Sequence, residues 1–224
     1  MTEIIFILDR SGSMEGLEAD TIGGFNSMMR KQASEPGDAL VSTLLFDNDV
    51  EIIHDRLNIK DVPEITSKEY YVRGCTALLD AVGGAIKHIS MIHKYARKED
   101  VPEKTLFIIT TDGMENASRR YSYEDVRSMV EHQKSKHGWE FIFLGANIDA
   151  AAEASRYGID SSMAVNYNCD PEGVEISFKV MEDVVSSYRS TCEAPKDWRK
   201  RIDDDFNSRG KNEKCISNSI KKRK

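Results

Sequence analysis

Five oxygen-bearing side chains carry the chemistry that this sequence offers. Asp9, Ser11 and Ser13 alternate in the run Asp-Arg-Ser-Gly-Ser, while Thr76 and Asp112 occur much further along the chain. Carboxylates and hydroxyls are hard ligands that suit magnesium, manganese or calcium and are poor for zinc or copper. An extended loop would point the three alternate side chains the same way, and the glycine between the serines would let the backbone bend around a cation. We therefore predict one divalent metal ion at Asp9, Ser11, Ser13 and Asp112, with Mg²⁺ as the best match and Mn²⁺ or Ca²⁺ as alternatives.

The elements around these residues matter, because an Asp-x-Ser-x-Ser spacing alone recurs by chance. The short apolar run 4–8 predicts a buried strand that leads directly into Asp9. Residues 106–110 predict another buried strand, which leads into Asp112. Thr76 precedes a helical apolar pattern over residues 77–95 and is the predicted N-cap of that helix.

The remaining segments alternate between predicted helices and strands. Apolar spacing predicts helices over 17–32, 123–136, 150–157 and 173–190, and strands over 139–144 and 163–167. Residues 39–46 and 50–57 flank the turn Asp47-Asn48-Asp49 and predict an antiparallel hairpin at one edge. The predicted fold class is therefore α/β, with a doubly wound, mostly parallel central sheet of order 3-2-1-4-5-6 and helices on both faces. In that order the first and fourth strands are neighbours, so Asp9 and Asp112 meet at the switch point where ligands bind.

The pattern resembles the von Willebrand factor type A domain with its metal-ion-dependent adhesion site. The Asp-x-Ser-x-Ser run, a distant Thr and an Asp followed by Gly occur in the order of that family, over about residues 3–167. The resemblance implies direct ligation by Ser11 and Ser13, and ligation by Thr76 either directly or through water. It implies that Asp9 and Asp112 act mainly through water or hydrogen bonds. It also indicates an intracellular, bacterial-type member with a single domain.

The resemblance further implies a function in binding. In that family, an acidic side chain of a partner often fills the remaining metal position. Neutral hydroxyl ligands leave a divalent charge largely uncompensated, which favours such an outside carboxylate. We therefore predict a metal-dependent protein-binding module that recruits an acidic side chain of a partner protein and has no catalytic residues. Asn116 fits the Asp-Gly-x-x-Asn pattern of many members and receives no ligand role.

An enzyme is the alternative function. A magnesium-dependent hydrolase or phosphatase would use Asp9 as its nucleophile, because such enzymes also place an Asp after the first strand. A second nearby carboxylate and a well-placed Lys would then be expected, whereas position 11 is Ser. Metal-dependent turnover of a phosphate ester separates the two classes.

Composition and charge indicate how the chain is organised into domains. The chain has 224 residues, of which 40% are hydrophobic and 31% charged, as in an ordinary globular protein. We predict one domain over residues 1–194, ending in the 173–190 helix, followed by a charged and partly disordered extension over 195–224. Residues 196–224 hold eleven Lys or Arg against five Asp or Glu, which leaves about −13 on the rest of the chain. An acidic body disfavours nucleic-acid binding by the domain.

The N-terminal segment and the cysteines predict a cytoplasmic location. The apolar run 4–8 is too short for a signal-peptide core or a membrane span, and no basic residue precedes it. The four cysteines show neither CxxC nor a zinc-ligand spacing, so we expect reduced thiols. No membrane association is expected.

Overall fold

A computed structural model describes residues 1–209, in which six strands form one sheet. In chain order the strands are β1 (Thr2–Asp9), β2 (Ala39–Phe46), β3 (Val50–Asn58), β4 (Lys104–Thr111), β5 (Glu140–Gly145) and β6 (Ala164–Asn166). Their order in the sheet is β3-β2-β1-β4-β5-β6, and only β2 and β3 pair antiparallel. The predicted fold class, strand order and antiparallel edge are confirmed.

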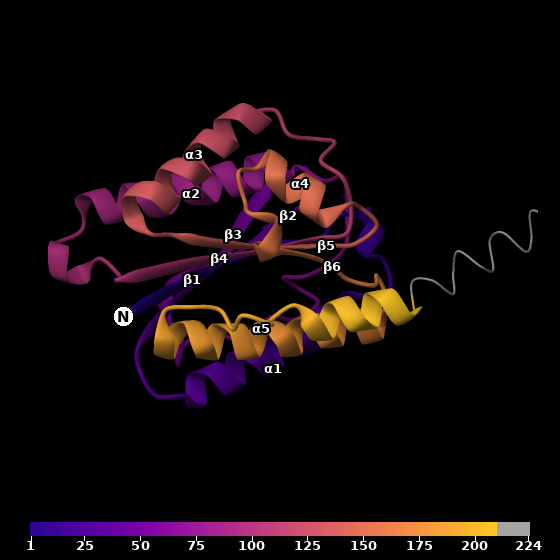
Figure 1. Cartoon of the computed structure of the whole chain (residues 1–224), viewed down its shortest axis with the longest axis horizontal. Coiled ribbons are helices and arrows are strands. Elements are labelled where there is room, and N and C mark those ends of the chain that lie inside the picture. The colour runs from indigo at the N-terminus through magenta and orange to yellow at the C-terminus, as the bar shows by residue number, and fades with distance from the viewer. Residues whose placement is uncertain (210–224) are drawn as a thin grey trace, which may run out of the picture.

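Helices cover both faces of the sheet (Figure 1). One face carries α1 (Glu18–Ser34) and α5 (Pro171–Thr191), and the other carries α2 (Leu78–Tyr95), α3 (Tyr123–His137) and α4 (Ala150–Arg156). The predicted elements agree with these bounds to within about two residues at each end. Short polar residues begin α3, α4 and α5, whose N-caps are Ser122, Asp149 and Asp170.

Strand β1 is buried on both faces, as its unbroken apolar sequence predicts. Ile4, Phe6 and Leu8 belong to the core beneath α1 and α5, whereas Ile5 and Ile7 belong to the core beneath α2 and α3. Each such side chain contributes about 1.5–3 kcal/mol on burial. The end of β1, where Asp9 lies, is therefore held by two cores at once.

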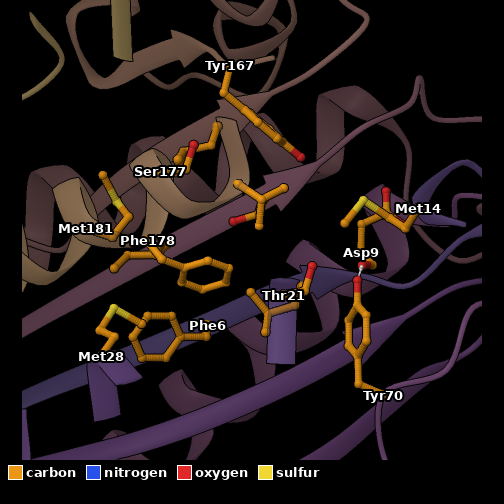
Figure 2. Close-up of a pocket in the computed structure, with 15 residues that line it drawn as sticks. Phe6, Asp9, Met14, Thr21, Met28, Tyr70, Tyr167, Ser177, Phe178 and Met181 are labelled. Carbon is orange, nitrogen blue, oxygen red and sulfur yellow. Dashed lines mark hydrogen bonds between the residues drawn. The ribbon is translucent and has the colours of Figure 1, made fainter. Parts of the chain in front are cut away.

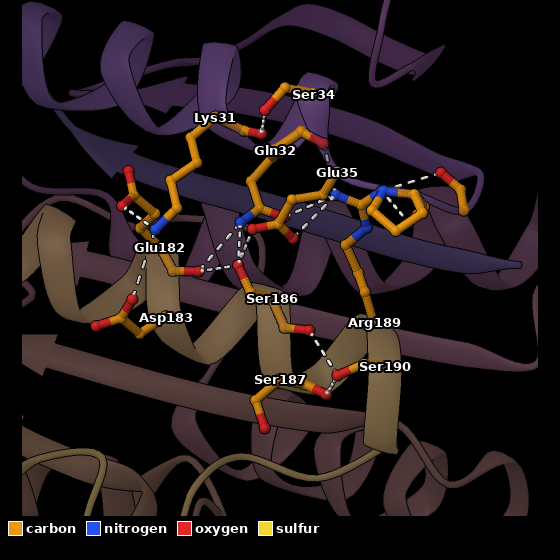
Figure 3. A network of polar contacts seen from close by, with 12 residues as sticks. Lys31, Gln32, Ser34, Glu35, Glu182, Asp183, Ser186, Ser187, Arg189 and Ser190 are labelled. Carbon is orange, nitrogen blue, oxygen red and sulfur yellow. Dashed lines mark hydrogen bonds and ion pairs between the residues drawn. The ribbon is translucent and has the colours of Figure 1, made fainter.

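Helix α5 is bonded to the end of α1 (Figure 3). The buried guanidinium of Arg189 donates to the backbone oxygen of Gln32 at 2.6 Å and to that of Gly37 at 3.0 Å. The Gln32 amide donates to Ser186 Oγ at 2.7 Å. The bond to Gln32 satisfies a carbonyl in the last turn of α1, where no i+4 helical amide follows, and the other two join α5 to the side chain of Gln32 and to the segment after α1.

The chain beyond α5 contributes to the same core. Trp198 is 8% exposed and Ile202 is 1% exposed, and both belong to the cluster that contains the apolar face of α5. Residues 200–209 are helical. The boundary predicted at residue 194 stays a prediction, and the predicted disorder of the extension concerns in part residues 210–224, which lie outside the described residues.

Within residues 1–209, none of the helices has both the length and the apolar character that a bilayer crossing needs. The cysteines in this range, Cys75, Cys169 and Cys192, are free thiols.

Candidate metal centre

Three loops meet at the carboxyl ends of β1 and β4. The two strands are parallel neighbours in register, with Leu8 opposite Thr110, so the loops that follow them emerge side by side. The third loop precedes α2 and reaches the first through a bond from the Gly12 amide to the Gly74 oxygen, at 3.1 Å. Asp9 ends β1, and the other four predicted site residues lie on these three loops.

Four side-chain oxygens form a continuous series of contacts. The Thr76 hydroxyl donates to Ser11 Oγ at 3.1 Å, and Ser11 Oγ lies 3.3 Å from Ser13 Oγ. The Ser13 hydroxyl in turn donates to Asp112 Oδ1 at 2.6 Å. Thr76, Ser11 and Asp112 are buried and Ser13 is exposed, so the series reaches the surface at Ser13.

Asp9 lies beneath this series and organises it. Its side chain is 2% exposed, and both of its carboxylate oxygens accept hydrogen bonds. Oδ1 accepts from the Ser11 amide at 2.7 Å, and Oδ2 accepts from the Thr111 hydroxyl at 2.7 Å. Burial raises the pKa of the Asp9 carboxyl to about 6, although the hydrogen bonds from Thr111 and Ser11 act in the opposite direction. Asp9 therefore fixes the loop and holds an incompletely solvated negative charge.

Asp112 is the second carboxylate at the centre. Besides Ser13, it receives the thiol of Cys169, whose Sγ lies 3.7 Å from Oδ2. Burial raises the pKa of Asp112, against the effect of the hydrogen bond from Ser13. Burial also raises the pKa of the Cys169 thiol to about 11, with a further contribution from Asp112. A divalent cation at this position would relieve the cost of keeping two desolvated carboxylates charged.

Thr76 is not the N-cap of α2, contrary to the prediction. The N-cap is Ala77, which makes no side-chain bond. The first amides of the helix instead find distant acceptors: Leu79 N donates to Glu115 Oε2 and Asp80 N donates to Ser118 Oγ. Because the loop after β4 supplies the cap, the Thr76 hydroxyl is left for the site.

The loop after β1 is only partly extended, and its glycine and Gly113 lie where other groups of the centre pack closely. Residues Gly12–Met14 form a 3-10 turn, so simple alternation does not explain why Ser11 and Ser13 meet. A Cβ on Gly12 would lie 3.3 Å from the Gly74 oxygen, which shows tight packing and not a bend around a cation. A Cβ on Gly113 would lie 3.4 Å from Thr76 Oγ1 and 3.5 Å from Ser13 Oγ. Gly113 therefore leaves open the space beside two of the candidate ligands.

The residues present fit a hard divalent cation. Magnesium binds oxygen at about 2.0–2.1 Å in octahedral geometry, which separates adjacent ligands by about 2.9 Å. The contacts of 3.1, 3.3 and 2.6 Å along the series lie around that value. Within residues 1–209, no group of three or more His, Cys, Asp or Glu side chains is placed to hold a metal ion. The candidate centre thus depends on hydroxyls, the donor set that magnesium accepts and zinc disfavours.

A cavity lies between this centre and helices α1 and α5 (Figure 2). Figure 2 shows Tyr70 reaching up to Asp9, whose backbone oxygen accepts from the Tyr70 hydroxyl at 2.6 Å. The cavity offers about 20 Å³ to the centre of a water molecule. Pockets for small molecules measure about 300–1,000 Å³, so this cavity cannot hold a substrate. Any ligand of the centre therefore approaches from the surface, where Ser13 lies.

Sequence reasoning missed three contributors to the centre. Thr111 and Tyr70 bond to Asp9, and Cys169 bonds to Asp112. Thr111 carried a usable signal, because it ends the strand beside β1. Tyr70 and Cys169 carried none, since their positions depend on how a long loop and the short β6 pack. Asn116, noted only as part of a pattern, accepts from the Thr76 amide at 2.9 Å.

Comparison with known proteins gives a likeness of structure alone. No protein-family model matches the chain, and no curated protein matches its sequence. Similar solved structures include the PilB minor pilin from Streptococcus sanguinis, with 15% identity and a TM-score of 0.57 over 87% of this chain and 63% of the pilin. The ArnB paralog VWA2 from Sulfolobus acidocaldarius gives 18% identity and a TM-score of 0.51 over 85% of this chain and 45% of that one.

A third similar structure is that of a metal-bound protein. Proximal thread matrix protein 1 from the mussel byssus, described with a zinc-occupied MIDAS motif, gives 17% identity and a TM-score of 0.52. The match covers 83% of this chain and 45% of that one. The chain thus spans less than two thirds of the length of each of these three proteins. Together with the strand order, this likeness shows that the chain has a von Willebrand factor type A-like α/β fold.

Proposed function

We propose that this chain is a divalent-metal-dependent protein-binding module that captures an acidic side chain of a partner protein. Ser11, Ser13 and Thr76 would hold the metal ion, Mg²⁺ in preference to Mn²⁺ or Ca²⁺. Asp9 and Asp112 would act through hydrogen bonds or water. A cytoplasmic setting belongs to the same proposal.

The observation that carries the proposal is the contact series from Thr76 through Ser11 and Ser13 to Asp112. Its three oxygen–oxygen distances lie near the edge length of a magnesium coordination shell. The bound metal would supply a positive charge that the hydroxyl ligands do not neutralise. Because Ser13 is exposed and Gly113 carries no side chain, a carboxylate can reach the ion from solvent.

The surroundings of Asp9 favour binding over hydrolysis. A nucleophilic Asp needs an oxygen free to attack the phosphorus atom. Both Asp9 oxygens already accept short hydrogen bonds, and the side chain is 2% exposed. The neighbouring cavity is also too small for a phosphate ester. Asp9 is therefore better placed to support the loop than to form a covalent intermediate.

Selection from random peptides tests the function for a partner of any sequence. A peptide library would be panned on the immobilised chain in Mg²⁺, and each bound peptide would be remeasured in EDTA and on Ser13→Ala. We expect the selected peptides to share an Asp or Glu, to lose binding in EDTA, and to lose it again when that residue becomes Asn or Gln. Peptides that bind equally well in EDTA and to Ser13→Ala would overturn the proposal.

The hydrolase alternative is tested on the same preparation. Release of p-nitrophenol from its phosphate ester would be followed with Mg²⁺, Mn²⁺ and Ca²⁺ across the pH range. We expect no metal-dependent turnover. Turnover that Asp9→Asn abolishes would assign the centre to catalysis instead.

A further inference from the structure

The turn between β2 and β3 holds the segment that carries Thr76. The Ala77 amide donates to the Asp47 oxygen at 2.8 Å, and the Cys75 amide donates to Asn48 Oδ1 at 2.7 Å. Thr76 is thus bonded to this turn through both of its neighbours in the chain. This turn carries none of the candidate ligands. Its two hydrogen bonds nevertheless hold the backbone on both sides of Thr76.

Gly74 permits this close approach. Its φ is +70°, a conformation that other residues rarely adopt. A Cβ at this position would lie 2.1 Å from Asn48 Oδ1, well inside contact distance. The backbone of the Thr76 segment therefore packs directly on the turn.

Arg10 joins the loop after β1 to the same turn. It lies between two candidate ligands in the sequence, and its guanidinium is fully buried. Arg10 Nε donates to Asp47 Oδ2 at 2.8 Å, and the same oxygen accepts from Arg73 Nε at 2.8 Å. A backbone hydrogen bond also joins the two loops, because the Arg73 amide donates to the Arg10 oxygen at 2.9 Å. One carboxylate oxygen therefore links the loop of Ser11 to the loop of Thr76.

Asp47 is held as an anion in this arrangement. Burial opposes its charge, but hydrogen bonds from Arg73, from the Asp49 amide and from Arg10 outweigh burial, so the pKa of Asp47 lies below its ordinary value. Its side chain is 2% exposed. Removal of that charge would leave the half-exposed Glu51, 2.8 Å from Arg10 Nη2, as the remaining carboxylate partner of the buried guanidinium, and such a loss disturbs both loops.

We infer that Asp47 is a positioning residue for the candidate metal centre: through Arg10 and Arg73 it sets Thr76 against Ser11. Its role in metal binding rests on the proposed function. Asp47 lies outside the contact series of oxygens, and its carboxylate accepts from Arg10, Arg73 and the Asp49 amide. Its effect on the metal is therefore exerted through the two loops.

The test compares Asp47→Asn with the wild-type chain by two measurements. Calorimetric titration of the EDTA-stripped proteins with Mg²⁺ should give an affinity about 10- to 100-fold lower in the variant, as for other outer-shell partners of metal ligands. Hydrogen exchange of the metal-free proteins should show faster exchange at the amides of Thr76 and Ala77. If Asp47→Asn fails to fold, Asn48→Ala takes its place in the test. Asn48 is exposed, and its substitution removes the bond to the Cys75 amide, so both changes should appear in weaker form.

Glu3→Gln is the matched control. Glu3 also lies in the interior and carries a carboxylate with two partners, Arg56 and His93, but it lies at the opposite end of β1. We expect Glu3→Gln to lower the melting temperature while leaving both Mg²⁺ affinity and exchange at Thr76 unchanged. If Asp47→Asn shows the same pattern as Glu3→Gln, Asp47 is only a stabilising residue and the inference is overturned.

The two proposals can fail separately. If the wild-type chain shows no saturable Mg²⁺ binding, the proposed function fails, and exchange in the metal-free protein still decides whether Asp47 positions Thr76. If the wild-type chain binds Mg²⁺ and Asp47→Asn binds it equally well, the inference about Asp47 fails and the proposed function stands.

Discussion

The hydroxyl of Thr76 donates a hydrogen bond to the hydroxyl of Ser11 at 3.1 Å, although 65 positions separate the two residues in the chain. No local structure enforces this contact. It depends on the place of β1 beside β4, on a helix cap supplied by the loop after β4, and on the turn after β2. The contact therefore reports on the assembly of the whole carboxyl edge of the sheet.

Gly113→Ala tests whether the space beside the candidate ligands is needed. The added methyl would make ordinary contacts with Thr76 Oγ1 and Ser13 Oγ, so the metal-free fold should keep its melting temperature. Affinity for Mg²⁺ should fall about ten-fold, because the methyl occupies space that the hydrated ion requires. Calorimetric titration measures the Mg²⁺ affinity. Gly84→Ala is the control, since a Cβ at Gly84 meets nothing within 4 Å. Equal affinities for both variants would contradict the expectation.

Two adjacent glycines of α1 should respond in opposite ways to substitution by Ala. A Cβ on Gly23 meets nothing within 4 Å, so Gly23→Ala should raise the free energy of unfolding by about 0.5–1 kcal/mol through helix propensity. A Cβ on Gly24 would lie 2.3 Å from the ring of Phe178 on α5, so Gly24→Ala should lower it by about 1–3 kcal/mol through overpacking. Urea unfolding measures both. Changes of the same sign would mean that α1 and α5 do not pack as described.

Trp198 should stabilise the domain although it follows α5. Its ring packs on the core that α5 covers, so Trp198→Ala should lower the free energy of unfolding by about 3 kcal/mol. The exposed Tyr95 is a suitable control, and Tyr95→Ala should change stability by less than about 0.5 kcal/mol. A negligible effect of Trp198→Ala in thermal unfolding would support a domain that ends at residue 194.

The buried His54 should make stability depend on pH. Burial lowers its pKa below the ordinary value of 6.5, with a small opposing effect from Glu69. Between the folded-state and unfolded-state pKa values of His54, the unfolded chain binds more protons than the folded chain. The free energy of unfolding therefore rises with pH in this window, and the contribution of His54 is lost as pH falls. His54→Gln can keep a hydrogen bond to Thr43 and should flatten this part of the profile, measured by urea unfolding at several pH values. Parallel profiles for the two proteins would refute this role.

Most of the fold could be predicted from the sequence, because its elements have unambiguous periodicity. The unbroken apolar run of β1 predicts a strand buried on both faces, and the turn Asp47-Asn48-Asp49 predicts the antiparallel hairpin. Once strands and helices alternate, parallel pairing and right-handed crossovers leave few possible orders. The strand order 3-2-1-4-5-6 then brings Asp9 and Asp112 to one edge.

The details of the site were less predictable, because they depend on contacts between distant loops. Thr76 has the residue type and position of an N-cap, yet Glu115 and Ser118 bond to the first helical amides from 36 and 38 positions away. Cys169 reaches Asp112 only because β6 completes the sheet. The sequence predicts which side chains share an edge, whereas packing decides their partners. The role of the five residues as metal ligands stays a prediction.

Titration of the EDTA-stripped protein with Mg²⁺, in parallel with Ser13→Ala, tests the central claim most directly. Ser13 is exposed, so the variant should fold, with a slightly lower melting temperature in the metal-free state because Asp112 loses the hydrogen bond from the Ser13 hydroxyl. We predict saturable one-to-one binding to the wild type and an affinity at least about ten-fold lower for Ser13→Ala. We also predict that millimolar Mg²⁺ raises the melting temperature of the wild type alone. Absence of both binding heat and a metal-linked rise in melting temperature in the wild type would contradict a metal centre on these residues.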